Sequence, residues 1–157
     1  MTNELIGSDN PLTTEQRDVL AIVLDLIVPA STDGRRPSAA DVDVLGHIRA
    51  TESGTLDNLG AELDRLDAEA RERHGEGFAS LDREMRRALV DDIRAAEPSF
   101  MRNLAIQTVT CYYQDDRVLE AIGLEARPPF PKGYEVPSGD LTLLDPVRKR
   151  GRVWREA

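Results

Sequence analysis

The sequence contains few of the residues that build catalytic or disulfide-bonded sites. It has one cysteine, Cys111, and two histidines, His47 and His74. A single cysteine excludes an internal disulfide, and the absence of CxxC, HExxH or Cys/His clusters argues against a zinc site. Cys111 stands among apolar residues of a predicted helix, which favours a small buried hydrophobe over a nucleophile. His74 falls at a predicted helix C-terminus, where capping is the better interpretation.

Motifs for nucleotide binding and for membrane insertion are also absent. There is no GxGxxG or GxxxxGK[ST] loop to hold a phosphate group. The longest apolar run, residues 19–28, is too short to span a bilayer. Residues 1–10 have no signal-peptide pattern, and Arg35-Arg36 is followed by proline rather than by an apolar run. We therefore expect no membrane insertion and a cytoplasmic location, with export alongside a partner left open.

Negative charge dominates the chain but is distributed unevenly. The net charge is −9, yet residues 124–157 carry seven Lys and Arg against five Asp and Glu. Residues 1–123 therefore hold 13 basic and 24 acidic side chains, a net charge of −11. Because nucleic-acid binding needs a basic surface, this balance argues against nucleic acid as a partner.

Residues 12–123 show helical spacing of apolar residues and no alternating strand pattern. Thr13 and Gln16 form a predicted capping box at the start of the first helix, which ends before Pro29. Further helix starts are predicted near Ser38, Gly54, Ser80, Pro98 and Asp116. We predict an all-α bundle of five to six helices over residues 12–123, preceded by a flexible N-terminus at residues 1–11.

The C-terminal segment, residues 124–157, combines five prolines with large apolar residues. Proline fixes φ and removes a backbone donor, which excludes a regular helix or central strand over most of the segment. A disordered tail would be poor in aromatic and aliphatic residues. We therefore predict an extended, Pro-rich arm that packs on its own body or on a partner.

A partner interface is predicted from the arm and from the tyrosine pair that precedes it. Such a pair more often places one ring in the core and one at an interface. The predicted interface residues are Tyr112, Tyr113, Phe130, Tyr134, Leu143, Leu144, Arg148 and Trp154.

The sequence contains no pair of residues that indicates general acid/base catalysis. Pairs of carboxylates that act in acid/base chemistry need burial, whereas pairs such as Asp91-Asp92 lie on predicted outer helix faces and should be solvated. We predict no catalytic, cofactor-binding or metal-binding residue in this chain. The residues therefore favour an interaction module over an enzyme.

Several segments together resemble the gluconate 2-dehydrogenase subunit 3 family, and the resemblance spans roughly Leu12 to Arg155. The segments that carry it are Leu12–Arg17, Arg71–Ala79, Cys111–Leu119, Pro129–Val136 and Leu143–Arg148. The resemblance implies a non-catalytic small subunit of a flavin-dependent sugar or sugar-acid dehydrogenase. Its partner would be a large FAD-binding oxidoreductase of the glucose-methanol-choline (GMC) type, sometimes joined by a multihaem cytochrome.

In that family the small subunit supports the folding and stability of the flavoprotein, so FAD is expected in the partner and not in this chain. Many members carry a twin-arginine signal, and this sequence departs from them there. The complex is expected to oxidise a sugar or glycoside hydroxyl. Two alternatives remain: an independent helical interaction or scaffold module without an oxidoreductase partner, and a small stand-alone enzyme.

Overall fold

The computed structural model describes residues 12–51, 53–127, 133 and 135–150. It divides into two compact units, a body ending at Ala126 and an arm beginning at Arg127. The predicted flexible N-terminus, residues 1–11, lies outside the described residues, as do Phe130, Tyr134 and Trp154. The described residues form helices and no strand, which confirms the predicted all-α class.

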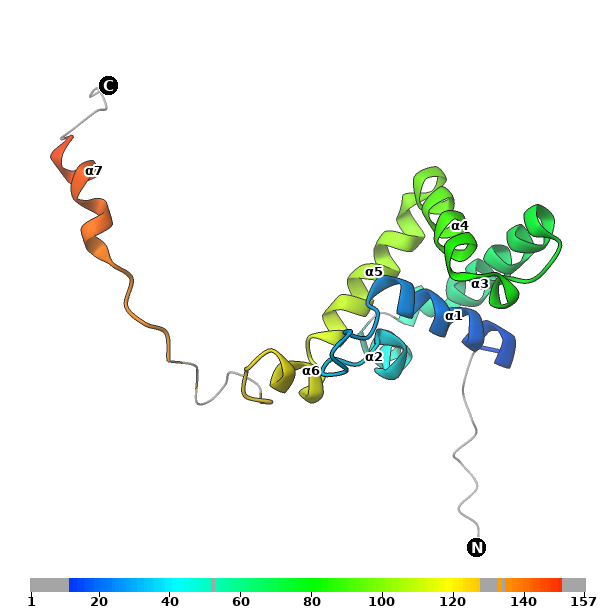
Figure 1. Ribbon diagram of the computed structural model, residues 1–157, viewed down its shortest axis with the longest axis horizontal. Coiled ribbons are helices and arrows are strands. Elements are labelled where there is room, and N and C mark those ends of the chain that lie inside the picture. Colours follow the sequence, from blue (N-terminus) through cyan, green and yellow to red (C-terminus); the bar gives the residue numbers. More distant parts are fainter. Residues whose placement is uncertain (1–11, 52, 128–132, 134, 151–157) are drawn as a thin grey trace, which may run out of the picture. The chain divides into compact units, whose positions relative to one another are not determined.

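The body is a set of helices arranged around α1 (Figure 1). In chain order its elements are α1 (Thr14–Ile27), the 3₁₀ turn η1 (Ala39–Asp41), α2 (Val44–Thr51), α3 (Ser53–His74), the 3₁₀ turn η2 (Phe78–Ser80), α4 (Arg83–Ala96), α5 (Pro98–Tyr112) and α6 (Asp116–Ala121). Helix α1 packs against α3, α5 and both 3₁₀ turns, while α5 also contacts α2 and α4. The predicted helical bundle is therefore confirmed.

The first helix begins with the predicted capping box. The backbone N–H of Gln16 donates to Thr13 Oγ1 at 3.2 Å, and the backbone N–H of Thr13 donates to Gln16 Oε1 at 2.9 Å. Gln16 Nε2 also donates to the Asp64 carboxylate on α3 at 3.0 Å. The same side chain thus caps α1 and joins it to α3. The helix ends at Ile27, shortly before Pro29.

The start of α4 differs from the sequence prediction. Its N-cap is Asp82, which accepts from the Met85 N–H at 2.8 Å, whereas Ser80 belongs to the turn η2. That turn fully buries Phe78, whose N–H donates to Asp67 Oδ1 on α3 at 2.8 Å. Ser80 and Asp82 are both good capping residues, so burial of the Phe78 ring decides between them.

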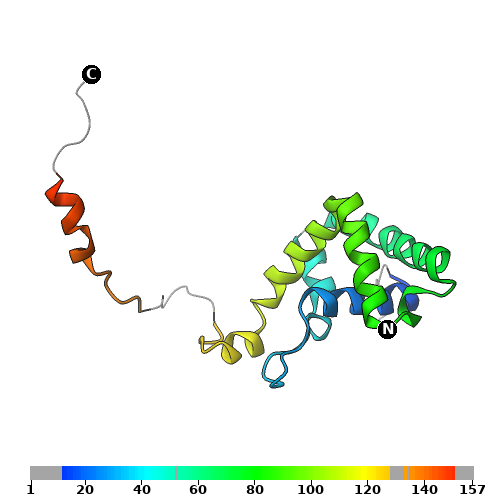
Figure 2. The same cartoon turned by 45° about the horizontal axis from the view of Figure 1, so that its top comes forward.

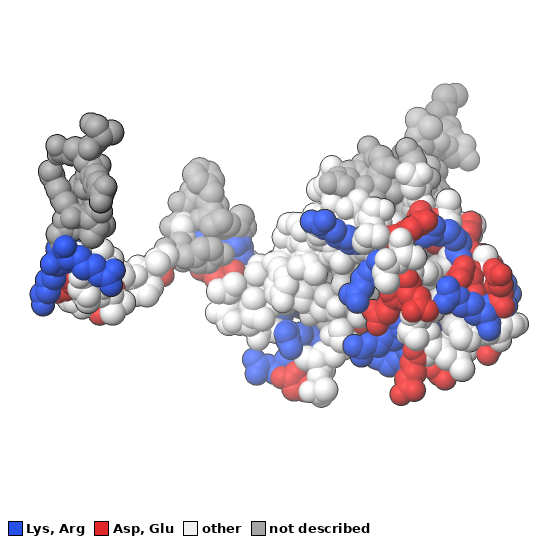
Figure 3. Space-filling view, turned by 90° about the horizontal axis from the view of Figure 1, so that it is seen from above, with Lys and Arg blue, Asp and Glu red and all other residues white. Residues whose placement is uncertain are grey.

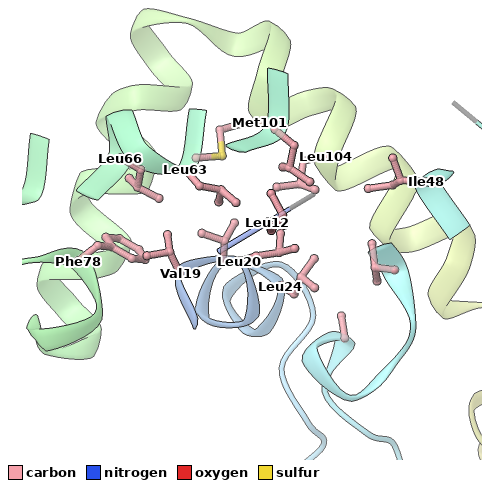
Figure 4. Close-up of a cluster of buried hydrophobic side chains, with 14 of the residues drawn as sticks. Leu12, Val19, Leu20, Leu24, Ile48, Leu63, Leu66, Phe78, Met101 and Leu104 are labelled. Atoms are coloured by element: carbon pink, nitrogen blue, oxygen red, sulfur yellow. The ribbon is translucent and has the colours of Figure 1, made fainter. Parts of the chain in front are cut away.

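The hydrophobic core lies between α1 and the helices that surround it. Figure 4 shows Val19 and Leu20 of α1 turned toward Leu63 of α3 and Leu104 of α5. All the residues of the buried core belong to the body, between Leu12 and Val118. The described part of the body is therefore closed over its own core.

The arm contains a short helix that the proline pattern did not predict. The 3₁₀ turn η3 (Leu141–Leu144) continues into α7 (Asp145–Lys149). Asp140 caps this pair of elements, accepting from the Thr142 N–H at 2.9 Å. Pro146 occupies the first turn of α7, where its missing N–H costs nothing. The prediction of an extended arm is therefore wrong over residues 141–149.

Candidate partner-binding surface

The predicted tyrosine pair at the end of α5 is split between the core and the surface. Tyr112 exposes only 1% of its surface, and its hydroxyl donates to the Pro37 carbonyl at 2.9 Å. Tyr113 exposes 49%, and the two rings meet edge to face with centroids 5.4 Å apart. The prediction that Tyr112 belongs to a partner interface is wrong, because its ring already fills the body's own core. Tyr113 keeps a free ring face.

Tyr113 borders an open hollow of about 480 Å³ at this end of the body. The hollow is lined by Tyr112, Tyr113, Arg36 and the segment 27–33 that follows α1. Burial raises the pKa of the Tyr112 hydroxyl, and the nearby charge of Arg36 acts in the opposite direction. Sequence reasoning missed Arg36, since the Arg35-Arg36 pair offers no local signal other than its likeness to an export motif.

Two arginine side chains connect the segment between α1 and α2 to α6, and Figure 2 shows this segment and α6 near the C-terminal end of α5. Arg35 Nη2 donates to the Ala121 carbonyl at 3.1 Å. From α6, Arg117 Nη2 donates to the Asp41 carbonyl at 2.9 Å. These two arginines therefore hold the rim of the surface that carries Tyr113.

Asp115 fixes the position of Arg117 and caps α6. Its carboxylate accepts from the Arg117 N–H at 3.0 Å, and from Arg117 Nε and Nη2 at 2.9 and 2.8 Å. The hydrogen bond from the Arg117 side chain is the main cause that holds the pKa of Asp115 below its usual value. The depressed pKa means that the charged carboxylate stabilises the folded state.

Asp115→Asn is expected to lower the free energy of unfolding by about 1 kcal/mol at neutral pH. Asparagine caps a helix as well as aspartate does, so the loss reports the charge. Because the folded pKa is depressed, the contribution is present above the unfolded pKa, about 3.9, and disappears as pH falls through the folded value. Urea unfolding of both proteins from pH 7 to 2.5 checks this. A difference in stability that stays constant over this range would contradict it.

The predicted arm residues that the structure describes are exposed. Leu143 exposes 76% and Leu144 46% of their surfaces, and Leu141 and Val147 are exposed as well. Leu141, Leu144 and Val147 recur every third residue, so they lie along one side of η3 and α7. Arg148 is exposed and pairs with Asp145 at 3.3 Å. The helix thus presents an apolar side flanked by charge.

Reactive groups do not converge in the described part of the chain. No group of three or more His, Cys, Asp or Glu side chains there could hold a metal ion. Burial raises the pKa of the Cys111 thiol, which disfavours the nucleophilic thiolate. No described helix is both long and apolar enough to cross a bilayer.

Comparison with known proteins returned one family. The profile described as gluconate 2-dehydrogenase subunit 3 matches residues 14–125, well over half of the chain and nearly all of the described body. Neither the curated proteins nor the solved structures gave a match.

Proposed function

The chain belongs to the gluconate 2-dehydrogenase subunit 3 family, and on that basis we propose that it is the non-catalytic small subunit of an FAD-dependent dehydrogenase of the GMC type. The family is one of small subunits of dehydrogenase complexes. In the proposed complex the catalytic subunit holds FAD and oxidises a sugar or glycoside hydroxyl. This chain binds that subunit and stabilises its fold.

One observation supports the proposal independently of the family match: the arm exposes large apolar side chains that are not part of the body's core. Leu141, Leu143 and Val147 each expose more than half of their surface. A helix of the length of α7 cannot bury such residues by itself, and a row of exposed aliphatic side chains marks an interaction site. A large partner subunit supplies the surface that these residues require.

Stabilisation of the catalytic subunit follows from mass action. A protein that binds only the folded form of its partner raises the partner's free energy of unfolding by RT ln(1 + [L]/Kd). At a concentration 100 times Kd this amounts to about 2.7 kcal/mol. The small subunit therefore needs no chemistry of its own to be required for dehydrogenase activity.

Co-expression of the tagged chain with the products of its neighbouring genes tests the proposal. We expect a yellow complex in which this chain and a protein several times larger occur in fixed stoichiometry. When the two proteins are separated under native conditions, the flavin should remain with the large protein. The large protein expressed alone should melt at a lower temperature than in the complex. A colourless preparation that contains only this chain would overturn the proposal and favour an independent helical module.

A further inference from the structure

Helix α5 has a second apolar face, on the side opposite the core. Its core face consists of Met101, Leu104, Thr108, Cys111 and Tyr112, all buried. Ile106 and Val109 expose 51% and 40% of their surfaces, and Tyr113 directly follows the helix. At 100° per residue, Ile106, Val109 and Tyr113 form one stripe whose centre lies about 140° from the centre of the core face. We call these three residues the α5 outer stripe.

A helix that is apolar on both sides is normally covered on both sides. One side of α5 is covered by α2, α4 and α1 within the body. The outer stripe has no such cover within the described part of the body, where all three of its side chains are exposed. On the face of the body that Figure 3 shows, charged residues crowd one end, and a broad uncharged area lies toward the other end.

Each end of the outer stripe carries an arginine. Arg102 precedes Ile106 by four residues, one helical turn, and Arg36 lines the same hollow as Tyr113. Both arginines are exposed, and neither guanidinium has a hydrogen bond or an ion pair within the described chain. An apolar centre with tyrosine and arginine at its edges is the composition of an energetically important protein interface.

The positive charge of these arginines indicates what kind of protein surface can bind the α5 outer stripe. The chain's own α7 carries Arg148 and Lys149 in its last turn, so docking it here would bring like charges together. A second copy paired antiparallel along α5 would place Arg102 opposite the other copy's Arg36, and a parallel copy would place Arg102 opposite Arg102. Both arrangements are disfavoured. The complementary partner is a different protein with an apolar patch bordered by carboxylates.

We propose that the α5 outer stripe, with Arg36 and Arg102, is a second docking surface for the catalytic dehydrogenase subunit, separate from the arm. This inference rests on the proposed function. Three side chains cover less than the roughly 800 Å² per partner of a stable interface, so the stripe acts together with the arm. Two linked contacts raise the overall affinity far above that of either one, because the second contact forms within the complex.

Two substitutions with matched controls test the proposal on the full chain and the flavoprotein that copurifies with it. Ile106→Glu places a charge in the stripe, and Met85→Glu makes the same kind of change at a residue of α4 that is 42% exposed. Arg102→Glu reverses a stripe charge, and Arg87→Glu reverses an exposed arginine of α4. Arg102→Lys retains the charge. All five variants should melt within about 2 °C of the unmodified chain, because the altered side chains are exposed.

We expect Ile106→Glu to weaken binding of the flavoprotein about 30-fold and Arg102→Glu about 10-fold. Met85→Glu, Arg87→Glu and Arg102→Lys should bind like the unmodified chain. Added salt should weaken the unmodified complex more than the Arg102→Glu complex. If the unmodified chain binds a flavoprotein and both stripe variants bind it equally well, the inference is overturned while the proposed function stands. If the unmodified chain binds no flavoprotein, the proposed function and the inference about the α5 outer stripe are both overturned. In that case, a dimer of this chain that the Ile106→Glu substitution dissociates would identify a second copy as the protein that covers the stripe.

Discussion

Tyr112→Ala is expected to lower the free energy of unfolding of the body by about 3–5 kcal/mol, whereas Tyr113→Ala changes it by less than about 0.5 kcal/mol. The Tyr112 ring is 1% exposed, so its removal leaves a cavity in the core. The Pro37 carbonyl also loses the hydroxyl that donates to it at 2.9 Å. Tyr113 is half exposed, so the solvent takes the place of its ring. Urea unfolding followed by circular dichroism measures both changes.

Tyr112→Phe separates the hydroxyl from the ring. It keeps the packing and removes one hydrogen bond, so about 1 kcal/mol is expected. The pair also behaves differently toward the partner: Tyr113→Ala should weaken binding of the flavoprotein without loss of stability. Equal destabilisation by the two alanine substitutions would show that the assignment of Tyr112 to the core and Tyr113 to the surface is incorrect.

The helical spacing of the core residues is enough to assign Tyr112 to the core and Tyr113 to the surface from the sequence. Met101, Leu104 and Thr108 recur at three- and four-residue steps, and Tyr112 continues that series while Tyr113 does not. The series is hard to recognise in α5 because Ile106 and Val109 place apolar side chains on the other face of the helix too. Exposed apolar residues on this second face therefore obscure the spacing that a core alone would show.

Local signals predicted the helix ends where one residue type determines them. The Thr13 capping box, the proline at the start of α5 and the predicted helix end at His74 of α3 are of this kind. Where two local signals compete, tertiary contacts decide. Ser80 and Asp82 both cap helices, and the burial of Phe78 could not be known before the fold.

In the arm, the composition of the whole segment led to a wrong prediction although the local signals for a helix are present. Its proline content predicts the absence of helix, yet Pro146 stands in the first turn of α7, the one place where a helix accepts it. Asp140 and Pro146 together specify the start of this helix by local chemistry. Counting prolines over the whole segment conceals a capped helix of nine residues in η3 and α7.

Ending the chain at Ala126 is expected to leave the body folded and to lower its affinity for the flavoprotein at least about 100-fold. The buried core lies between Leu12 and Val118, so the truncation removes none of it. Its melting temperature should therefore stay within about 2 °C of that of the full chain. The exposed side chains of Leu141, Leu143 and Leu144 are lost together with the arm. Thermal melting and a binding titration on the two proteins measure these effects.

A full-length variant locates the loss within the arm. Leu143→Asp combined with Leu144→Asp charges two exposed leucines of η3 and should reproduce most of the loss, because burying an unpaired carboxylate at an interface is costly. Ser138→Asp adds a carboxylate at an exposed polar position of the arm and should bind normally. If the truncation instead lowers the melting temperature by more than about 5 °C, the arm covers its own body, and the exposed α5 outer stripe alone is left to bind the flavoprotein. Unchanged affinity after truncation would exclude the arm from the interface altogether.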